Sequence, residues 1–444
     1  MFSTPTDPSP EEIYTLRTRT TALIFVTVCG TLIAIGLTAQ QPAPTEAPAG
    51  FDTPTLAVQN AGSQSSSNGI AEPPGDTFVL DQQIFERRED VNTPGLGPLF
   101  NATSCSECHQ NPVSGGASQI TEVRVGHRDD NGNFANPSVS INDGQNTISG
   151  RSLINDRAVC AQAQEHVPSA ENIRALRAVL NTLGDGFVEA IDDNAIVAIA
   201  NGQPGLSNGM IQGEAIHVPV LEAPGMTRVG RFGWKDQHSS LLSFVADAYL
   251  NEMGVTSRLK PTDTTTLCKT TTDPEDKPDQ LGLANIDHFT QFIRGTKVPP
   301  RDSTLAAAND AVAGQKMFES IGCNICHVES FTTLPAGSPI DGGQFTVPDA
   351  LGNRVIHPFS DFLLHDVGTG DGIYQAGPMD TVNKMRTAPL WGLRVKSRFM
   401  HDFASQTLQA AILRHKGEAL HVTRSFKDLT LTQQQQLITF LNSL

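Results

Sequence analysis

The chain has 444 residues, 38% of them hydrophobic and 18% charged, so it can bury a sizeable core. This length predicts two domains. Its formal net charge is −16, from 31 Lys and Arg against 47 Asp and Glu, which disfavours a nucleic-acid partner. The seven cysteines are an odd number and cannot all pair within one chain, so their spacing carries the information.

The N-terminal part contains a mostly apolar segment, 21–39, preceded by two arginines. A segment of this length can just span a hydrocarbon core, and the arginines would keep the N-terminus cytoplasmic. We therefore predict that residues 1–39 are a signal peptide or a signal anchor and that the rest is periplasmic. Residues 37–39 are a weak cleavage site, so cleavage and anchoring in the inner membrane both stay open. Residues 40–76, rich in Pro, Ala, Ser and Gly, predict a flexible linker.

Two copies of the pattern C-x-x-C-H follow, far apart in the sequence. This pattern is the signal for covalent attachment of haem c, because two thiols three positions apart can each reach one vinyl group of the porphyrin. The adjacent histidine then binds the iron. A zinc site would need four ligands in one cluster, which the separation of the two motifs disfavours. We therefore predict two haem c groups, held by Cys105, Cys108 and His109 and by Cys323, Cys326 and His327.

Two further cysteines, Cys160 and Cys268, lie outside both motifs. An oxidising compartment would allow them to form a disulfide, which the sequence leaves open.

The residues around the second motif are typical of a small haem module. Residues 303–321 predict an amphipathic helix with Ser303 as N-cap, and residues 429–444 predict a C-terminal helix with one apolar stripe. In small cytochrome folds the first and last helices cross and clamp the haem. We therefore predict a mainly α fold of two cytochrome-c-like haem domains, 77–300 and 301–444, with long irregular loops and with the N-terminal domain enlarged.

Several segments of the chain carry a family resemblance. They are GRFGWK (230–235), NEMG (251–254), SDFLLHD (360–366), MRTAPLWG (385–392), FMHD (399–402) and TLQAAILRHKGEA (407–419). With them the chain closely resembles the bacterial di-haem oxidoreductases, which are related to di-haem cytochrome c peroxidases and to the di-haem enzymes that mature methylamine dehydrogenase. The likeness runs from about Phe85 to the C-terminus and is weak over roughly 120–225.

The resemblance implies a sixth ligand for the second haem. His415 lies fourteen positions after His401, where the relatives place that ligand, so the resemblance implies a His327/His415 pair. Met400 is a competing ligand. A surface position on a helix is the structural alternative for His415.

The resemblance also implies roles near the first haem. Trp234 matches the Trp that bridges the two haems, and Glu252 matches the distal acid/base; the alternatives are a core Trp and a solvated Glu. The relatives carry Gln where this chain has Phe244, which weakens the case for peroxide chemistry. They also carry Gly where this chain has Phe403, a difference that we expect to alter only a turn. His127 is a candidate distal ligand of the first haem.

The expected function is therefore that of a di-haem oxidoreductase of the cytochrome c peroxidase type. Electrons from a small cytochrome or a cupredoxin would enter at the C-terminal haem and pass by Trp234 to the N-terminal haem, where peroxide is reduced or an organic or protein substrate is oxidised. A non-catalytic di-haem electron-transfer cytochrome is the alternative. A calcium ion between the haems stays open. A membrane contact is expected only through residues 21–39, if they are retained.

Overall fold

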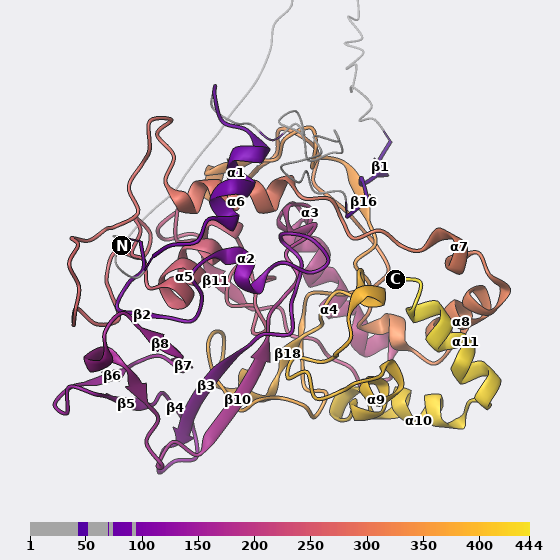
Figure 1. Cartoon of the computed structure of the whole chain (residues 1–444). Coiled ribbons are helices and arrows are strands. Elements are labelled where there is room, and N and C mark those ends of the chain that lie inside the picture. The colour runs from indigo at the N-terminus through magenta and orange to yellow at the C-terminus, as the bar shows by residue number, and fades with distance from the viewer. Residues whose placement is uncertain (1–42, 52–69, 71–73, 91–94) are drawn as a thin grey trace, which may run out of the picture. The chain divides into compact units, whose positions relative to one another are not determined.

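The structure is a computed structural model that describes residues 43–51, 70, 74–90 and 95–444 (Figure 1). The predicted signal segment, 1–39, lies outside the described residues, and so does most of the predicted linker. Ala43–Leu444 forms one compact unit. Among its described residues, no helix has both the length and the apolar character needed to cross a membrane.

Part of the predicted linker is bonded to the folded unit. Strand β1 (Thr45–Glu46) pairs in parallel with β16 (Arg354–Ile356). Gly50 N donates to Val298 O at 3.0 Å. Residues 43–51 therefore run along the unit and do not form a free tether.

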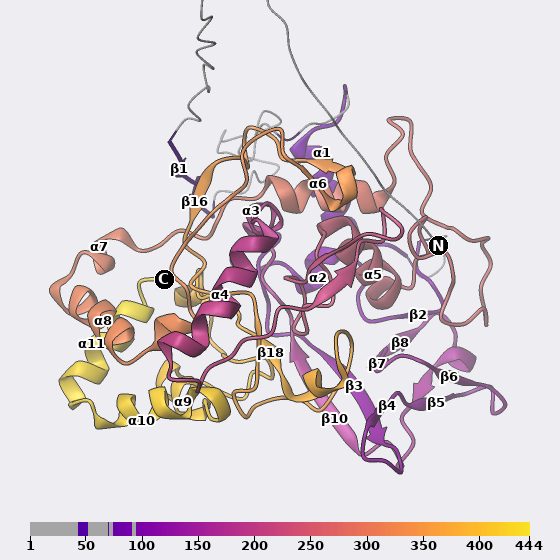
Figure 2. The same ribbon diagram turned by 180° about the vertical axis from the view of Figure 1, so that it is seen from behind.

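Helices lie mainly around the two cysteine motifs and in the C-terminal part (Figures 1 and 2). Their bounds are α1 Phe78–Glu86, α2 Cys105–Cys108, α3 Asp185–Glu189, α4 Asp193–Leu206, α5 Leu241–Met253, α6 Asn285–Gly295, α7 Ser303–Ala306, α8 Asn309–Ser320, α9 Leu408–Arg414, α10 Leu420–Asp428 and α11 Leu431–Leu441.

Strands form several small sheets. The other strands are β2 Leu99–Phe100, β3 Thr121–Arg128, β4 Phe134–Ala135, β5 Ser138–Ile141, β6 Thr147–Ser149, β7 Leu153–Ile154, β8 Arg157–Ala158, β9 Glu165–His166, β10 Ile173–Ala178, β11 His217–Pro219, β12 Thr227–Val229, β13 Phe331–Thr332, β14 Pro339–Ile340, β15 Phe345–Thr346, β17 Leu364–His365 and β18 Met385–Arg386. The longest pair is antiparallel, β3 with β10. The prediction of a mainly α fold therefore needs correction, because residues 121–178 are built from strands and not from irregular loops.

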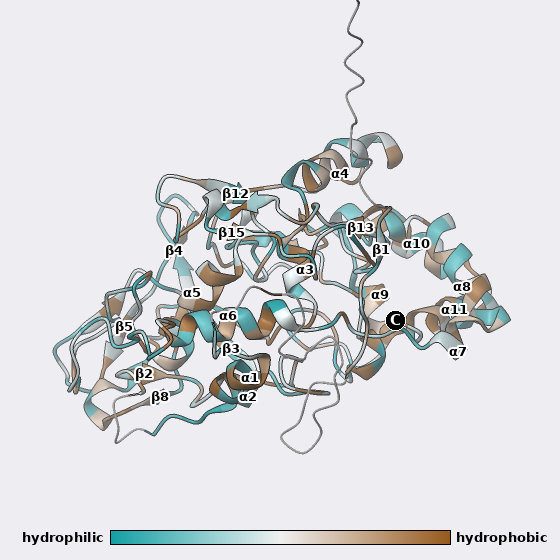
Figure 3. Cartoon of the chain, turned by 90° about the horizontal axis from the view of Figure 1, so that it is seen from above, coloured by the Kyte–Doolittle hydropathy of each residue, from teal (hydrophilic) through white to brown (hydrophobic). Residues whose placement is uncertain are grey.

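The larger core packs against the first cysteine motif. Helices α1 and α6 lie side by side and present aromatic rings to each other (Figure 1). Phe85 of α1 lies 4.6 Å from Phe292 of α6 between ring centroids, and 6.3 Å from His109. Helix α6 has its apolar residues on one face and its polar residues on the other, visible as brown and teal stretches in Figure 3. This core therefore covers one side of His109.

The second core is built from the C-terminal helices. Helices α8 and α11 cross with their backbones in close contact. A Cβ atom added to Gly314 of α8 would lie only 1.9 Å from Gln436 O of α11. Phe318 and Phe440 pack at 5.2 Å, and the ring of His327 lies 6.3 Å from Phe318. The predicted crossing of the first and last helices around the second motif is therefore present.

The predicted helix over 303–321 is found in that part of the chain, but it is not continuous. It is divided into α7 and α8, and Asp302, not Ser303, caps the first part by accepting from Leu305 N at 2.9 Å. The second part starts after Ala308, whose ψ of 142° is extended. Asn309 and Asp310 follow, and such residues favour the first turn of a helix over its interior. The predicted boundary between the two haem domains at 300/301 stays a prediction.

A disulfide joins Cys160 to Cys268, with Cα atoms 6.4 Å apart. It ties the strand-rich segment to the long loop before α6. The pairing left open by the sequence is therefore present.

Candidate functional site

The first cysteine motif forms one short helix. Ser104 caps α2 by accepting from Glu107 N, and His109 N donates to Cys105 O at 3.0 Å, which closes the turn. Neither Cys105 nor Cys108 is in a disulfide. Burial lowers the pKa of His109 to about 4, so the imidazole is neutral, and its buried Nδ1 has no hydrogen-bond partner among the described residues. A neutral imidazole is the form that binds iron.

The second motif is built similarly. Gly322 has a φ of 93°, which a glycine adopts without strain, and it turns the chain from α8 into the motif. His327 N donates to Cys323 O at 3.0 Å. The Nδ1 of His327 lies 3.0 Å from Phe359 O, and burial lowers the pKa of this imidazole to about 4. This hydrogen bond puts the proton on Nδ1 and leaves Nε2 free to bind a metal.

His415 has the same arrangement. It follows the last turn of α9, and its Nδ1 lies 2.9 Å from Ala411 O. Burial lowers its pKa, so the ring is neutral. The two rings are close enough for His415 to lower the pKa of His327. His415 is therefore half-buried, lies near His327 and does not stand on an open helix face, which supports its role as a ligand; the His327/His415 pair stays a prediction.

One cavity connects these residues. It has a volume of about 260 Å³ and is partly open to solvent. Cys323, Cys326, His327 and His415 line it, and most of its other lining side chains are apolar, among them Phe318, Val422, Leu437 and Leu441. Two neutral imidazoles, two thiols and an apolar wall are the donor set and the surroundings of a covalently bound haem. The residues around the second motif therefore fit the predicted haem c.

Two cationic side chains, the buried Arg386 and the half-buried Lys396, also line this cavity. Arg386 Nη1 donates to Arg231 O at 2.9 Å, but its Nε, 3.8 Å from Asp236 Oδ1, makes no hydrogen bond. Burial, together with the charge of Arg386, lowers the pKa of Lys396 to about 8. A haem carries two carboxylate side chains, and cations in an apolar cavity are the partners that such groups need. The sequence analysis did not single out either residue.

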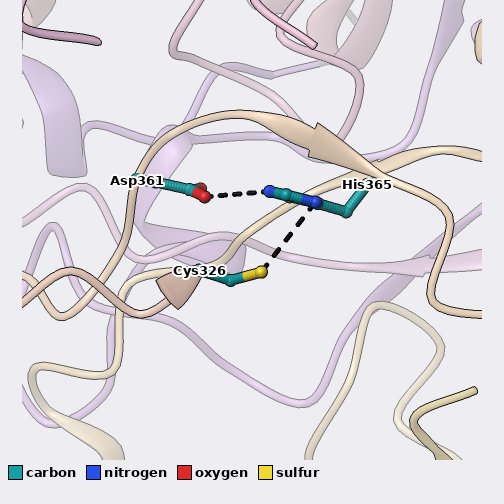
Figure 4. A group of neighbouring side chains, drawn as sticks. All are labelled: Cys326, Asp361 and His365. Atoms are coloured by element: carbon teal, nitrogen blue, oxygen red, sulfur yellow. Dashed lines mark hydrogen bonds and ion pairs between the residues drawn. The ribbon is translucent and has the colours of Figure 1, made fainter. Parts of the chain in front are cut away.

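A charged histidine lies beside the second motif (Figure 4). His365 Nδ1 is 3.9 Å from Cys326 Sγ and 2.8 Å from Glu418 Oε2, and Nε2 is 2.8 Å from Asp361 Oδ2. Although burial favours the neutral ring, Asp361 holds the pKa of His365 well above its ordinary value. A thioether at Cys326 would be a poor metal ligand, so this group places a positive charge near the site and does not bind an ion. Asp361 and His365 lie in the segment SDFLLHD, which carries the family resemblance, but the sequence assigned no role to either residue.

Trp234 lies in the wall of the same cavity. Its Nε1 donates to Ala178 O at 2.7 Å, and its ring lies 6.0 Å from His401 at an interplanar angle of 69°. The next residue, Lys235, anchors this loop by an ion pair with Asp371 and by hydrogen bonds to three carbonyl groups. Asn111, two positions after His109, lines the cavity as well. Trp234 is therefore placed where the surroundings of the two motifs meet.

Glu252 lies near the first motif. It is in the last turn of α5, and its Oε2 accepts from Asn101 Nδ2 at 2.8 Å. Burial, and after it the charge of Glu252, raises the pKa of the Cys108 thiol to about 12, so this carboxyl is within electrostatic reach of the motif. It is not a solvated residue.

A second carboxyl controls the charge of Glu252. Burial and the neighbouring Glu122 raise the pKa of Glu252 to about 8. Arg124, with its Nε 2.5 Å from Glu122 Oε1, helps to hold the pKa of Glu122 below its usual value despite burial. At neutral pH the pair therefore holds one proton, on Glu252. Glu122 had no signal in the sequence, since it lies where the family likeness is weak.

Other predicted residues lie elsewhere or play structural parts. His127 Nδ1 lies 2.8 Å from Glu171 Oε2, and no contact of His127 with the first motif is found among the described residues. Phe244 stacks on Phe232 with centroids 6.0 Å apart. Met400 lines the cavity and stays a competing ligand. Phe403 has a φ of 54° in a turn, the conformation that glycine favours, so this departure from the relatives does concern only a turn.

Comparisons with known proteins agree with this geometry. Residues 170–444 match the family described as "Di-haem oxidoreductase, putative peroxidase". The second motif, His415, Trp234 and Glu252 lie inside the matched range, and the first motif lies before it. No curated protein matches the chain.

Two solved structures are similar to this chain. One is Kuenenia stuttgartiensis hydrazine synthase pressurised with xenon, with 14% identity and a TM-score of 0.39, covering 98% of this chain and 100% of that chain. The other is a MauG-like protein associated with microbial copper homeostasis, with 16% identity and a TM-score of 0.29, covering 59% of this chain and 89% of that chain. At these TM-scores the two structures add nothing to the family match.

Proposed function

The chain belongs to the di-haem oxidoreductase family, and from this premise we propose that it is a periplasmic c-type enzyme of the cytochrome c peroxidase type. A small redox protein, a cytochrome c or a cupredoxin, would donate the electrons, and peroxide or an organic or protein substrate would be the second reactant. The proposed donor would dock through charge complementary to this acidic chain. Export and retention by residues 21–39 belong to the same proposal. A calcium ion between the haems stays a prediction.

The chain's own residues would hold two covalent haem c groups. Cys105 and Cys108 would form the thioethers of the first, with His109 on its iron. Cys323 and Cys326 would form those of the second, with His327 and His415 on its iron. When bound, the haems would supply one-electron chemistry, taking electrons from the donor at the C-terminal site and delivering them to the oxidant at the N-terminal site.

The observation that carries the enzymatic proposal is the carboxyl pair beside the first motif. Reduction of peroxide requires one oxygen to lose a proton while the other gains one and leaves as water. Glu252 holds a proton at neutral pH, and Glu122 beside it is kept ionised by Arg124. Two carboxyls whose pKa values are pushed apart offer an acid and a base at the same place. We assign the transfer of the proton to Glu252 and the control of its pKa to Glu122.

Trp234 would serve the transfer of electrons between the two sites. Its indole is fixed by the hydrogen bond to Ala178 and by the anchored Lys235, so it needs no rearrangement during turnover. Its place in the cavity wall supports this part of the proposal.

The experiment is peroxide turnover by the purified holoprotein with a reduced small cytochrome as donor. Glu252→Gln keeps the size and the hydrogen bond but cannot cycle a proton, so turnover should fall by about 10²–10⁴-fold with haem content unchanged. The exposed Glu319→Gln, on α8, is the matched control and should keep full turnover. Full activity in Glu252→Gln would remove Glu252 from the mechanism.

A non-catalytic electron-transfer cytochrome is the second candidate. The observation that favours it is Phe244, which packs against Phe232 and His238 and offers no hydrogen bond to a bound oxygen species. In that case both irons would be six-coordinate, and neither Glu252→Gln nor added peroxide would change the behaviour of the protein.

A further inference from the structure

A buried cluster of three metal-binding side chains lies between α1 and α6, outside the sites described above. Asp76 precedes the N-cap of α1, Asp81 lies in its first turn, and His288 lies in the first turn of α6. These residues are 5%, 0% and 1% exposed. One ligand atom from each lies within 4.8 Å of the other two.

The histidine is oriented as a metal ligand is. His288 Nε2 lies 3.3 Å from Asp279 Oδ2, so it can donate its proton to that carboxylate. Its Nδ1 is hydrogen-bonded to Asp81 Oδ1 at 2.6 Å and lies 3.6 Å from Asp76 Oδ1, so an ion bound by this nitrogen would replace the proton that it shares with Asp81. A carboxylate that holds the far nitrogen of a ligating imidazole is the usual surrounding of a histidine bound to zinc.

Two carboxylate oxygens of the cluster lack partners. Asp76 Oδ2 and Asp81 Oδ2 are buried and make no hydrogen bond within the described part of the chain. The only group ion-paired with either carboxyl among the described residues is His288. A buried carboxylate without a partner is costly.

We propose that Asp76, Asp81 and His288 bind one Zn²⁺, with Asp279 positioning the histidine. Two carboxylates neutralise a dication, and one imidazole nitrogen favours zinc over calcium or magnesium. Donors about 2.0–2.2 Å from a tetrahedral zinc lie about 3.3–3.6 Å from one another, so the 3.6 Å separation fits and the 2.6 Å separation would widen when the ion binds. Water would complete the coordination. The ion would join α1 to α6, the two helices whose aromatic rings pack near His109.

The other clusters of the described chain do not offer such a site. The carboxyls of Asp263, Asp273 and Glu275 surround the ammonium of Lys269, which occupies the place of an ion. The cluster with Cys326 would lose its thiol to the haem. Asp76 and Asp81 lie before the range matched by the family, so the proposed site is a feature of this chain and not of the match.

The test is calorimetric titration of Zn²⁺ into untagged holoprotein that has first been treated with a chelator. We expect one Zn²⁺ per chain, a higher melting temperature with Zn²⁺, and release of protons on binding. The double variant Asp76→Asn/Asp81→Asn should lose both the binding and the shift. Asp279→Asn should weaken binding by about 10–100-fold, as expected for a residue that orients the ligand. Asp263→Asn is the control and should bind as the wild type does.

Haem content and circular dichroism establish that each variant is folded. Should the double variant not fold, Asp279→Asn, whose side chain is 41% exposed, decides the question alone. Absence of Zn²⁺ binding by the wild type, equal binding by a folded double variant, unchanged affinity of Asp279→Asn, or preference for Ca²⁺ over Zn²⁺ would each overturn the proposal.

Discussion

His327 and His415 each donate the Nδ1 proton to a backbone carbonyl, of Phe359 and Ala411 respectively. The hydrogen bonds fix both the tautomer and the direction of the ring, so Nε2 is the free nitrogen of each imidazole. Because the carbonyls belong to the backbone, this orientation does not depend on any further side chain. This arrangement supports the proposal that His327 and His415 bind one iron.

Replacing His415 with methionine tests this assignment. A thioether stabilises the ferrous state relative to an imidazole, so His415→Met should raise the reduction potential of one haem and leave the other unchanged. Spectroelectrochemical titration of the holoprotein measures both. Met400→Leu is the control, because Met400 lines the same cavity and competes for the role. If Met400→Leu moved the potential and His415→Met did not, the ligand assignment would be wrong.

Glu122 gives a prediction about pH. In the wild type, turnover should fall as the pH rises through about 8, because the carboxyl pair then loses its last proton. Glu122→Gln removes the negative charge that raises the pKa of Glu252, so the alkaline fall of turnover should move to lower pH. A pH profile of kcat, with Glu319→Gln as control, measures this. An alkaline limit unchanged in Glu122→Gln would show that the pair does not govern turnover.

Local spacing was enough to predict some of the site. The two motifs follow from neighbouring residues, and the resemblance singled out His415 and Trp234, which the structure brings to one cavity. Arg386 and Lys396 could not be predicted, because they reach that cavity only through tertiary packing and stand in no pattern of their own. Glu122 could not be predicted either, since β3 brings it to Glu252 from a segment without family likeness.

At the scale of elements, the close crossing of α8 and α11 depends on glycine at position 314, because glycine has no side chain. Gly314→Ala would place a Cβ against the backbone of Gln436, so we expect the free energy of unfolding to fall by about 1–3 kcal/mol. Gly202→Ala, inside α4, meets nothing within 4 Å and should be neutral or stabilising by up to about 1 kcal/mol. Urea unfolding of the two holoprotein variants measures both. Equal effects would mean that the crossing does not depend on close backbone contact.

The elements that sequence reasoning missed are those without a helical period. The strand pairs of residues 121–178 are held by backbone ladders such as β3 with β10 and by the Cys160–Cys268 disulfide. Their loops are rich in Gly, Asn and Asp, a composition that predicts turns but not the register between strands. The helices around the second motif, by contrast, carry their own caps and apolar stripes, so their places were predictable.

At the scale of the whole molecule, one cavity extends from the second motif to the segment after the first, and Trp234 lies in its wall. Trp234→Phe keeps an aromatic ring but removes the indole and its hydrogen bond to Ala178. We expect peroxide turnover with an external donor to fall by about tenfold, equivalent to about 1.4 kcal/mol in the barrier, with haem content unchanged. Trp391→Phe, the chain's other tryptophan and also a lining residue, is the matched control. Equal effects of the two changes would remove the special role of Trp234.

The central claim is that the first site is open for chemistry and the second is closed by two histidines. The ferric EPR spectrum of the purified protein, at rest and after half-reduction, tests it most directly. We predict a low-spin signal from the His327/His415 site together with a high-spin signal from the first site that changes when peroxide is added. Two low-spin signals in both states, unaffected by peroxide, would contradict the account and identify the protein as an electron-transfer cytochrome.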